Sequence, residues 1–300
     1  MNLTCQIEHS FDCHQGAIRK VTLNVDGEYC LTCGSDKTIK LWNPRKQLLL
    51  KTYSGHGFEV MDVDCSCDSS QLISGSHDKT LILWDVTTGQ PLRRLRAHIA
   101  VVNVVRFNED STVFVSGSLD GMVKIWDGKS NSREPIQVLD EAKDSISYLA
   151  ITDHEIATVS LDHHLRRYDI RKGIMEADNL HSPLTYVNFT NDSQCMLVSG
   201  MNNLLKLVDK SSGQILASFE GHLNQKYRID NGFLDNDSLI ISGSEDGNIY
   251  IWSLLEGTIL TKLQHKQKVI HTFAIHPTKM ELISGAENKV HIWQITKKTN

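Results

Sequence analysis

The sequence predicts an all-β fold in which seven four-stranded units form one ring within a single domain, residues 1–300. An aromatic or bulky apolar residue recurs at a spacing close to 42 residues. These positions are Trp42, Trp84, Trp126, Tyr168, Val208, Trp252 and Trp293. A sustained period of about 40 to 45 residues is typical of β-propellers, in which each period forms one blade. Seven periods in phase therefore predict a seven-bladed propeller.

The repeated text within the units identifies the kind of propeller. A Ser-Gly-Ser-x-Asp segment places Asp78 six residues before Trp84 and Asp120 six residues before Trp126, and a Gly-His pair at His56 opens a unit. A Gly-His opening with a Trp-Asp ending is the signature of the WD repeat. The repeats are predicted at roughly residues 10–47, 52–89, 94–130, 138–173, 177–213, 218–256 and 261–296.

Short runs of β-forming residues between turn residues predict the strands of each unit. Residues 38–42 and 80–84 are such runs, and each ends on the repeated tryptophan. The dipeptides Asp120-Gly121 and Asp246-Gly247 favour tight hairpin turns. Four antiparallel strands are expected in each blade.

The two ends of the chain predict how the ring closes. Only seven residues follow Trp293, too few for a further turn and strand, so the seventh blade lacks its outer strand. Residues 3–8 belong to no unit and are predicted to supply that strand. Pairing the first strand with the last removes an open sheet edge.

The composition is that of a soluble module: 22% of the residues are charged, 40% are hydrophobic, and the formal net charge is −5. The N-terminus lacks the order of a secretion signal, and the apolar stretches are strand-sized, so neither secretion nor membrane insertion is predicted. Seven cysteines without a pairing pattern favour reduced thiols and a cytoplasmic and nuclear location.

Cys30 and Cys33 form a Cys-x-x-Cys segment that could suggest zinc or redox chemistry. Positions three apart on a strand point to opposite faces, and no second pair follows at zinc spacing. We therefore predict blade packing for both cysteines and no metal site.

His56, Ser74 and Asp78 could form a hydrolytic triad, but nearly the same set recurs in three other units. An enzyme needs one active site rather than four copies. We predict buried structural networks in which the carboxylate meets the imidazole, the imidazole meets the hydroxyl, and the indole N–H ends the relay. The predicted members are His14, Thr32, Asp36 and Trp42; His56, Ser74, Asp78 and Trp84; His98, Ser116, Asp120 and Trp126; and His222, Ser242, Asp246 and Trp252. No catalytic or cofactor-binding residue is predicted, and the protein is not expected to be an enzyme.

Three units depart from this set. Ala142 stands at the His position of the fourth unit, Asn202 and Val208 replace the Asp and Trp of the fifth, and Glu287 or Asn288 occupies the turn of the seventh. Blades four and five are therefore expected to be the softer side of the ring.

Residues 28–44, 53–60, 139–144 and 166–171 resemble the mitogen-activated protein kinase organizer family of WD-repeat proteins, and the likeness extends over the whole chain, including the fourth unit that lacks His. This resemblance implies a non-catalytic scaffold that gathers components of the extracellular-signal-regulated kinase cascade. It also implies a place as a protein component of splicing complexes, and cell-polarity proteins as further partners.

Because the repeats use the interior of a propeller, binding is predicted on a face of the ring. WD-repeat proteins generally bind partners on the face that carries the turn between the second and third strands, where the residue before the turn Asp points outward. In chain order this slot holds Ser35, His77, Leu119, Leu161, Met201, Glu245 and Ala286. The strand after each His position adds Arg19, Glu59, Met61, Val101, Asn103, Gln225, Tyr227, Lys268 and Ile270.

We predict a partner-binding arc from the apolar members of these two sets. It consists of Met61, Val101, Leu119, Leu161, Met201 and Tyr227. The alternative is that loops cover these side chains or that they pack locally, since isolated apolar surface residues are common.

Two other parts of the sequence bear on further classes of function. Basic residues gather at Arg93–Arg96 and at residues 166–172, but they alternate with acidic ones, so direct binding of nucleic acid is not predicted. The run Tyr168-Asp169-Ile170-Arg171 resembles the ending found in substrate receptors of cullin-type ubiquitin ligases, which is the alternative function. The ring is expected to be a monomer.

Overall fold

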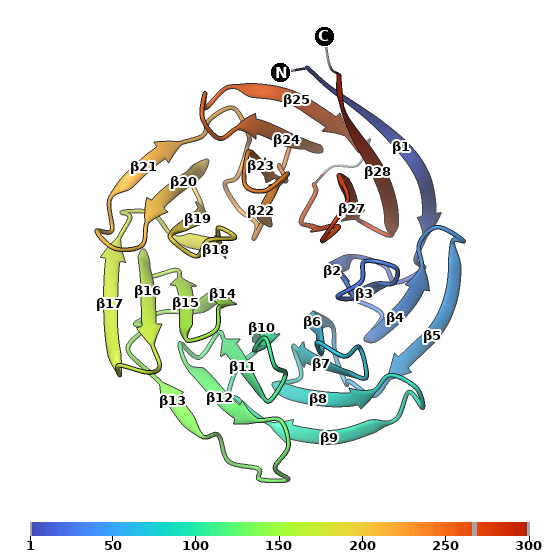
Figure 1. Cartoon of the computed structure of the whole chain (residues 1–300). Coiled ribbons are helices and arrows are strands. Elements are labelled where there is room, and N and C mark those ends of the chain that lie inside the picture. The colour runs from blue at the N-terminus through green and yellow to red at the C-terminus, as the bar shows by residue number, and fades with distance from the viewer. Residues whose placement is uncertain (1, 266–268, 299–300) are drawn as a thin grey trace.

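Seven four-stranded antiparallel sheets are arranged radially around a central axis in the computed structural model, which describes residues 2–265 and 269–298 (Figure 1). In the first six blades four consecutive strands run from the inner strand to the outer one. The predicted all-β, seven-bladed propeller is confirmed. No helix of the described residues has the length and hydrophobicity needed to cross a bilayer.

The strands of the first four blades follow one another along the chain. Blade one contains β2 (Ile18–Leu23), β3 (Cys30–Gly34), β4 (Thr38–Asn43) and β5 (Leu48–Ser54). Blade two contains β6 (Val60–Cys65), β7 (Gln71–Ser76), β8 (Thr80–Asp85) and β9 (Pro91–Arg96). Blade three contains β10 (Val102–Phe107), β11 (Val113–Ser118), β12 (Val123–Asp127) and β13 (Gln137–Leu139). Blade four contains β14 (Ile146–Ile151), β15 (Glu155–Ser160), β16 (His164–Asp169) and β17 (Ile174–Asn179).

The last three blades complete the ring. Blade five contains β18 (Leu184–Phe189), β19 (Cys195–Gly200), β20 (Leu204–Asp209) and β21 (Ile215–Ser218). Blade six contains β22 (Asn231–Leu234), β23 (Leu239–Ser242), β24 (Asn248–Ser253) and β25 (Ile259–Gln264). Blade seven contains β26 (Thr272–Ile275), β27 (Glu281–Ala286), β28 (Lys289–Lys298) and, as its outer strand, β1 (Asn2–Asp12).

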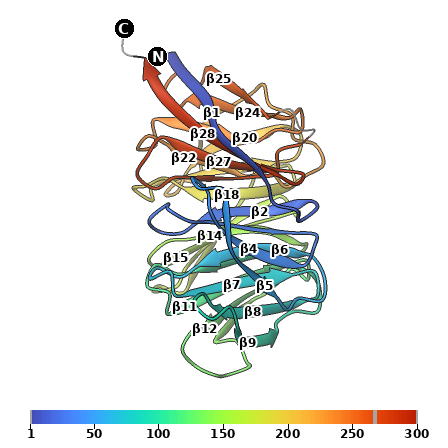
Figure 2. The same cartoon turned by 90° about the vertical axis from the view of Figure 1, so that its right-hand side faces the viewer.

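The ring is closed by pairing between the first and last strands. β1 runs antiparallel to β28, with Ile7 opposite Trp293 and a register shift before His9 (Figure 2). This confirms the predicted closure, although β1 is longer at both ends than the predicted residues 3–8. The edge of the last blade is thereby covered by a segment from the other end of the chain.

The glycine of the Ser-Gly-Ser text is explained by close contact between neighbouring blades. A Cβ atom added at Gly75 would lie 2.6 Å from Cγ1 of Val102 in blade three. One added at Gly117 would lie 2.7 Å from Cγ2 of Ile146 in blade four. Neither distance leaves space for a methyl group, so glycine allows the inner strand of the next blade to approach.

The core lies between the blades. One apolar cluster joins Ile73 and Leu81 of blade two to Trp126 of blade three, which is 1% exposed. Cys30 and Cys33 are fully buried on β3, and both are free thiols. Burial raises the pKa of the Cys33 thiol well above its usual value. The two cysteines therefore serve as small packing residues.

Candidate functional site

Blade two contains a four-residue hydrogen-bond network. Nδ1 of His56 lies 3.0 Å from Oδ2 of Asp78, and Nε2 of His56 lies 2.8 Å from Oγ of Ser74. The indole N–H of Trp84 donates to the same Ser74 oxygen at 2.8 Å. Burial alone would raise the pKa of Asp78, but hydrogen bonds from His56 and Thr80 hold it well below its usual range.

Blade three repeats this geometry. His98 lies 3.0 Å from Oδ2 of Asp120 and 2.8 Å from Oγ of Ser116, and Trp126 donates to Ser116 at 3.0 Å. The His98 and Asp120 side chains are 0% and 2% exposed. Burial opposes ionisation of Asp120, but the bond and charge of His98 together with the backbone N–H groups of Met122 and Ile99 outweigh it and lower the pKa to about 2. A substrate has no access to groups this deeply buried, so the network stabilises the blade.

The predicted network of blade one is wrong at its histidine. His14 is exposed, and its backbone N–H donates to Asp12. Gln15 is buried in its place, where its Oε1 accepts a bond of 2.5 Å from Thr32, while Trp42 donates to Thr32 at 2.9 Å. Asp36 instead accepts bonds from the N–H and hydroxyl of Thr38. These residues lie after the end of β1, where His14 adopts a left-handed backbone conformation and burial alternates from Cys13 to Gly16, so Gln15 is buried and His14 is exposed.

The predicted network of blade six is also wrong. His222 is buried, but neither ring nitrogen has a hydrogen-bond partner among the described residues, and burial lowers its pKa to about 4. Asp246 accepts a bond of 2.6 Å from the Tyr250 hydroxyl. The other two members bond to backbone carbonyls: Ser242 donates to Gly243, and Trp252 donates to Glu220. The four residues are present but are not connected.

The residue four places after the turn Asp explains part of this difference. Tyr250 occupies this position in blade six, and Arg166 occupies it in blade four, where its Nη2 lies 2.6 Å from Oδ2 of Asp162. Blade two has Ile82 there, which offers no polar atom, so Asp78 is left for its histidine. In blade six the tyrosine hydroxyl therefore occupies the carboxylate in place of the histidine. A polar residue at this position is not sufficient for this, because Lys124 of blade three donates to the Ala97 carbonyl and leaves Asp120 bonded to His98.

Five of the six predicted binding residues border one cavity at the mouth of the central channel. They are Met61, Leu119, Leu161, Met201 and Tyr227, and the cavity has a volume of about 300 Å³. Leu119 and Tyr227 are 50% and 44% exposed. Val101 lies outside this lining, and its carbonyl accepts the N–H of Leu119. We refer to the face that carries the turns between second and third strands as the turn face.

Two large apolar side chains of the turn face were missed by the sequence reasoning. Phe58 is 59% exposed and its ring lies 6.1 Å from that of His77, and Ile99 is 77% exposed beside Asp120, which accepts its N–H. Each follows a network histidine by one or two residues, a signal that could have found them. Of the other positions considered, Ile270 is buried and Lys268 lies outside the described residues.

The opposite side of the cavity is cationic. Arg19, Lys226, Arg228 and His271 line it. Arg19 is paired with Glu59 at 2.8 Å, whereas within the described part of the chain neither Lys226 nor Arg228 has a carboxylate in salt-bridge range. Burial and the charges of Arg19 and Arg228 lower the pKa of His271. Glu245 lies close by, but its Oε1 accepts the backbone N–H of Lys226 at 2.6 Å rather than pairing with the ammonium group. The mouth therefore combines an apolar arc with two cations that have no carboxylate partner among the described residues.

A buried polar cluster lies deeper in the channel. Nζ of Lys20 lies 2.7 Å from Asp230 and 2.9 Å from the hydroxyl of Tyr186, which stacks on Tyr148 with ring centroids 3.7 Å apart. Burial alone would lower the pKa of Lys20, but Asp230 raises it, so the lysine stays charged. This cluster borders a second cavity of about 530 Å³, and Arg228 lies over the Tyr148 ring. The charges of Lys20 and Asp230 are paired with each other, and this pair connects blade one to blade six across the ring.

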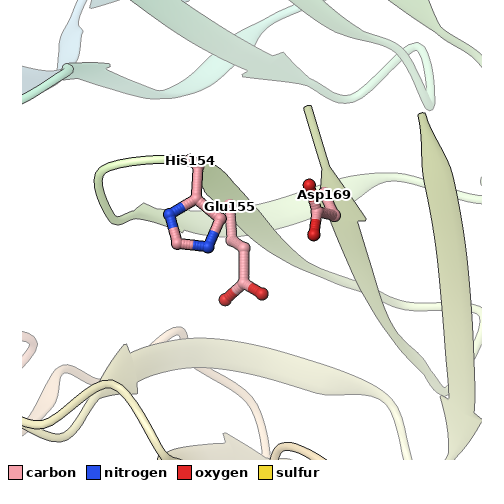
Figure 3. Close-up of side chains that lie close together, drawn as sticks. All are labelled: His154, Glu155 and Asp169. Carbon is pink, nitrogen blue, oxygen red and sulfur yellow. The ribbon is translucent and has the colours of Figure 1, made fainter. Parts of the chain in front are cut away.

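His154, Glu155 and Asp169 form the one group among the described residues whose potential metal-ligand atoms gather within 4.8 Å (Figure 3). Both carboxylates already have cationic partners, because Glu155 pairs with Lys210 at 2.9 Å and Asp169 with Lys172 at 3.0 Å. The first pair joins blade four to blade five. The geometry therefore indicates a structural contact between blades rather than a metal centre.

The basic residues noted in the sequence are largely engaged within the protein. Arg93 donates to the Asp127 carbonyl at 2.8 Å, and Arg94 donates to the Gly55 carbonyl. Arg167 pairs with Glu176 at 2.8 Å, and Arg171 pairs with Asp153 at the same distance. These contacts leave the cations interleaved with acceptors rather than gathered on one broad face.

Comparison with known proteins agrees with the fold. The sequence profile of the family described as "WD domain, G-beta repeat" matches residues 5–43, 47–85, 89–127 and 213–253. The chain is 54% identical over 285 residues to WD repeat domain-containing protein 83 of Rattus norvegicus, covering 95% of this chain and 90% of that protein. Identity to the Homo sapiens protein of the same name is 53%, with the same coverage. A Dictyostelium discoideum protein named as its homolog is 35% identical, over 93% of this chain and 95% of its own length.

Proposed function

The chain belongs to the WD-repeat family of β-propellers, and from this premise we propose that it is a non-catalytic scaffold that holds other proteins on its turn face. One observation carries the proposal: five side chains from blades two to six converge on one cavity at the channel mouth. The polar sets that resemble a catalytic triad are buried in the blades. Binding groups and stabilising groups therefore occupy different parts of the molecule.

The proposed partners are components of the extracellular-signal-regulated kinase cascade and proteins of pre-mRNA splicing complexes, with cell-polarity proteins as further partners. This part of the proposal rests on the resemblance to the mitogen-activated protein kinase organizer family. The protein is proposed to act in both the cytoplasm and the nucleus, and its place in a splicing complex would depend on protein contacts. An exposed apolar arc suits such contacts, because apolar and aromatic anchors contribute much of the affinity at protein interfaces.

Proximity labelling with the full chain, carried out separately on nuclear and cytoplasmic fractions, tests this proposal. We expect kinase-cascade proteins in the cytoplasmic fraction and splicing proteins in the nuclear one, in excess over a labelled control propeller. Absence of both sets would contradict the proposed roles. Recovery of one set alone would restrict the function to that compartment.

The alternative function, a substrate receptor of a cullin-type ubiquitin ligase, is favoured by one feature. The Arg171 side chain is 67% exposed at the end of β16, where an adaptor protein could reach it. Tyr168 of the same motif is 7% exposed and donates to Glu141 at 3.0 Å. Co-purification of a cullin adaptor with the parent, lost in Arg171→Glu and retained in a Lys172→Glu control, would support the receptor.

A further inference from the structure

The turn-face cavity has an apolar side and a cationic side, and the two sides together determine which ligand can bind. Met61, Leu119, Leu161 and Met201 form the apolar side, and Lys226 and Arg228 stand on the cationic side. The chain as a whole carries a net charge of −5, so two neighbouring cations without carboxylate partners among the described residues are a local exception. A ligand that matches both sides must carry negative charge next to an apolar group.

Arg228 has hydrogen-bonding capacity left for a ligand. Its guanidinium donates to the carbonyl of Asn103 at 2.7 Å, and its second terminal nitrogen lies 3.5 Å from the carbonyl of Met61. A guanidinium carries five N–H donors, so these bonds orient the group without exhausting it. Carbonyl oxygens also leave the positive charge uncompensated. Arg228 is therefore held in place and available to a carboxylate.

The wall of the same cavity also contains a buried threonine. Thr185 lines the cavity and is 2% exposed, and its hydroxyl has no hydrogen-bond partner among the described residues. A buried hydroxyl without a partner costs stability unless another molecule satisfies it. Because the hydroxyl oxygen itself is buried, Thr185 is part of the cavity wall and the carboxylate is assigned to Arg228.

The size of the cavity limits the occupant. About 300 Å³ holds one or two side chains and excludes a folded domain. Ile99 is exposed beside the turn of Asp120, which directly follows Leu119, and Phe58 is exposed beside His77 at the corresponding turn of blade two. An extended peptide could place one acidic side chain in the mouth and lay its apolar neighbours along this surface.

We propose that the turn-face mouth binds an extended segment of a partner protein that carries an aspartate or glutamate within two residues of a leucine, methionine or phenylalanine. Arg228 receives the carboxylate, Lys226 supports its charge, and the apolar arc receives the neighbouring side chain. This proposal rests on the proposed scaffold function and names the chemistry of its ligand.

Selection of short random linear peptides on the immobilised full chain tests the proposal. We expect enriched peptides to combine an acidic residue with a nearby large apolar residue. A synthetic peptide of the enriched sequence should lose about tenfold to a hundredfold in affinity with Arg228→Gln and retain much of it with Arg228→Lys. It should also lose affinity with Leu119→Asp/Leu161→Asp, but not with Leu92→Asp/Leu216→Asp on the exposed outer strands β9 and β21.

Lys226→Glu provides a second charge variant, because its exposed side chain can be reversed without disturbing the bonds of Arg228. Affinity for the acidic peptide should fall in this variant as well, which keeps the proposal testable if Arg228→Gln proves unstable. Enrichment of neutral or basic peptides that depend on Leu119 and Leu161 would overturn the acidic ligand while leaving the turn face as the docking surface. Peptides that depend only on Leu92 and Leu216 would contradict both the ligand and the proposed face.

Two remaining outcomes also count against the proposal. Failure to enrich any peptide over an unrelated propeller would overturn it. So would Arg228-dependent binding of a fluorescent oligouridylate that no enriched peptide displaces, because the occupant would then be RNA.

Discussion

The hydroxyl of Tyr250 donates to Oδ2 of Asp246 at 2.6 Å, and this bond holds the turn carboxylate of blade six. His222, at the histidine position of that blade, is buried without a hydrogen-bond partner among the described residues. Blade two, with Ile82 at the position of Tyr250, joins its histidine to its aspartate instead. One side chain thus changes the polar interior of a blade while its strands keep the same arrangement.

Removing the Tyr250 hydroxyl should change the ionisation of Asp246. The pKa of this carboxyl is held low against burial, first by the Tyr250 bond, so we expect Tyr250→Phe to raise it. Carboxyl-carbon NMR titration measures this value. Tyr29→Phe, on an exposed ring of blade one, serves as the control. An unchanged Asp246 pKa would show that the tyrosine does not control this carboxylate.

Stability should fall as pH drops below neutral because of two buried histidines. Burial lowers the pKa of His222 to about 4 and that of His265 to about 3, whereas the unfolded chain protonates near 6.5. Between these values the unfolded state binds more protons, so the free energy of unfolding decreases with falling pH. The depressed pKa of Asp120 acts in a lower window, since its stabilisation is present above about pH 4 and lost below it.

Urea unfolding at about pH 7, 6 and 5 checks this expectation, because an ordinary histidine titrates in this range. His222→Asn should reduce the dependence of unfolding free energy on pH, whatever its effect at pH 7. His181→Asn, at an exposed histidine, should leave the dependence unchanged. A free energy that is constant from pH 7 to 5 would contradict the neutral, buried state of these imidazoles.

The blade-three network should contribute measurably to stability. Asp120→Asn weakens the bond to His98 inside the protein, where loss of such a partner costs about 1–3 kcal/mol. Chemical unfolding should therefore show a loss of this size. His14→Asn is the matched control, because that histidine is exposed in blade one and should cost less than about 0.5 kcal/mol. Equal losses for the two variants would count against the distinction drawn between these blades.

Closure of the ring depends on the N-terminal strand. Deleting residues 1–9 removes most of the pairing between β1 and β28 and exposes the edge of the last blade. We expect a lower melting temperature and concentration-dependent aggregation, measured by light scattering during heating. A truncated protein as stable and monodisperse as the parent would mean that this pairing is dispensable.

The architecture could be predicted from the sequence because it is repeated. The recurrence from Trp42 to Trp293 indicates seven blades, and the few residues after Trp293 indicate that the N-terminal strand closes the last one. The polar interiors were harder to predict, because they depend on small local differences. In blade one the buried side chain is Gln15 and not its neighbour His14. In blade six Tyr250 donates to Asp246, and this carboxylate does not bond to His222.

The binding face was only partly accessible to sequence reasoning. The repeat defines the position before each turn aspartate, so the sequence predicted that Leu119, Leu161 and Met201 lie on one face, and all three border the same cavity. The cationic side comes from Arg228, whose segment between β21 and β22 departs from the strand pattern of other blades. Its approach to the Asn103 and Met61 carbonyls across the ring follows from the three-dimensional arrangement and not from any local motif.

The central claim is that the turn face binds partners through side chains that the fold does not need. Titration of the purified full chain with a purified partner captured by the parent, in parallel with Leu119→Asp/Leu161→Asp and Leu92→Asp/Leu216→Asp, tests it most directly. We predict at least about a tenfold loss of affinity for the first variant, none for the second, and melting temperatures near that of the parent for both. Parental affinity in a folded Leu119→Asp/Leu161→Asp protein would contradict the claim and direct attention to the outer strands.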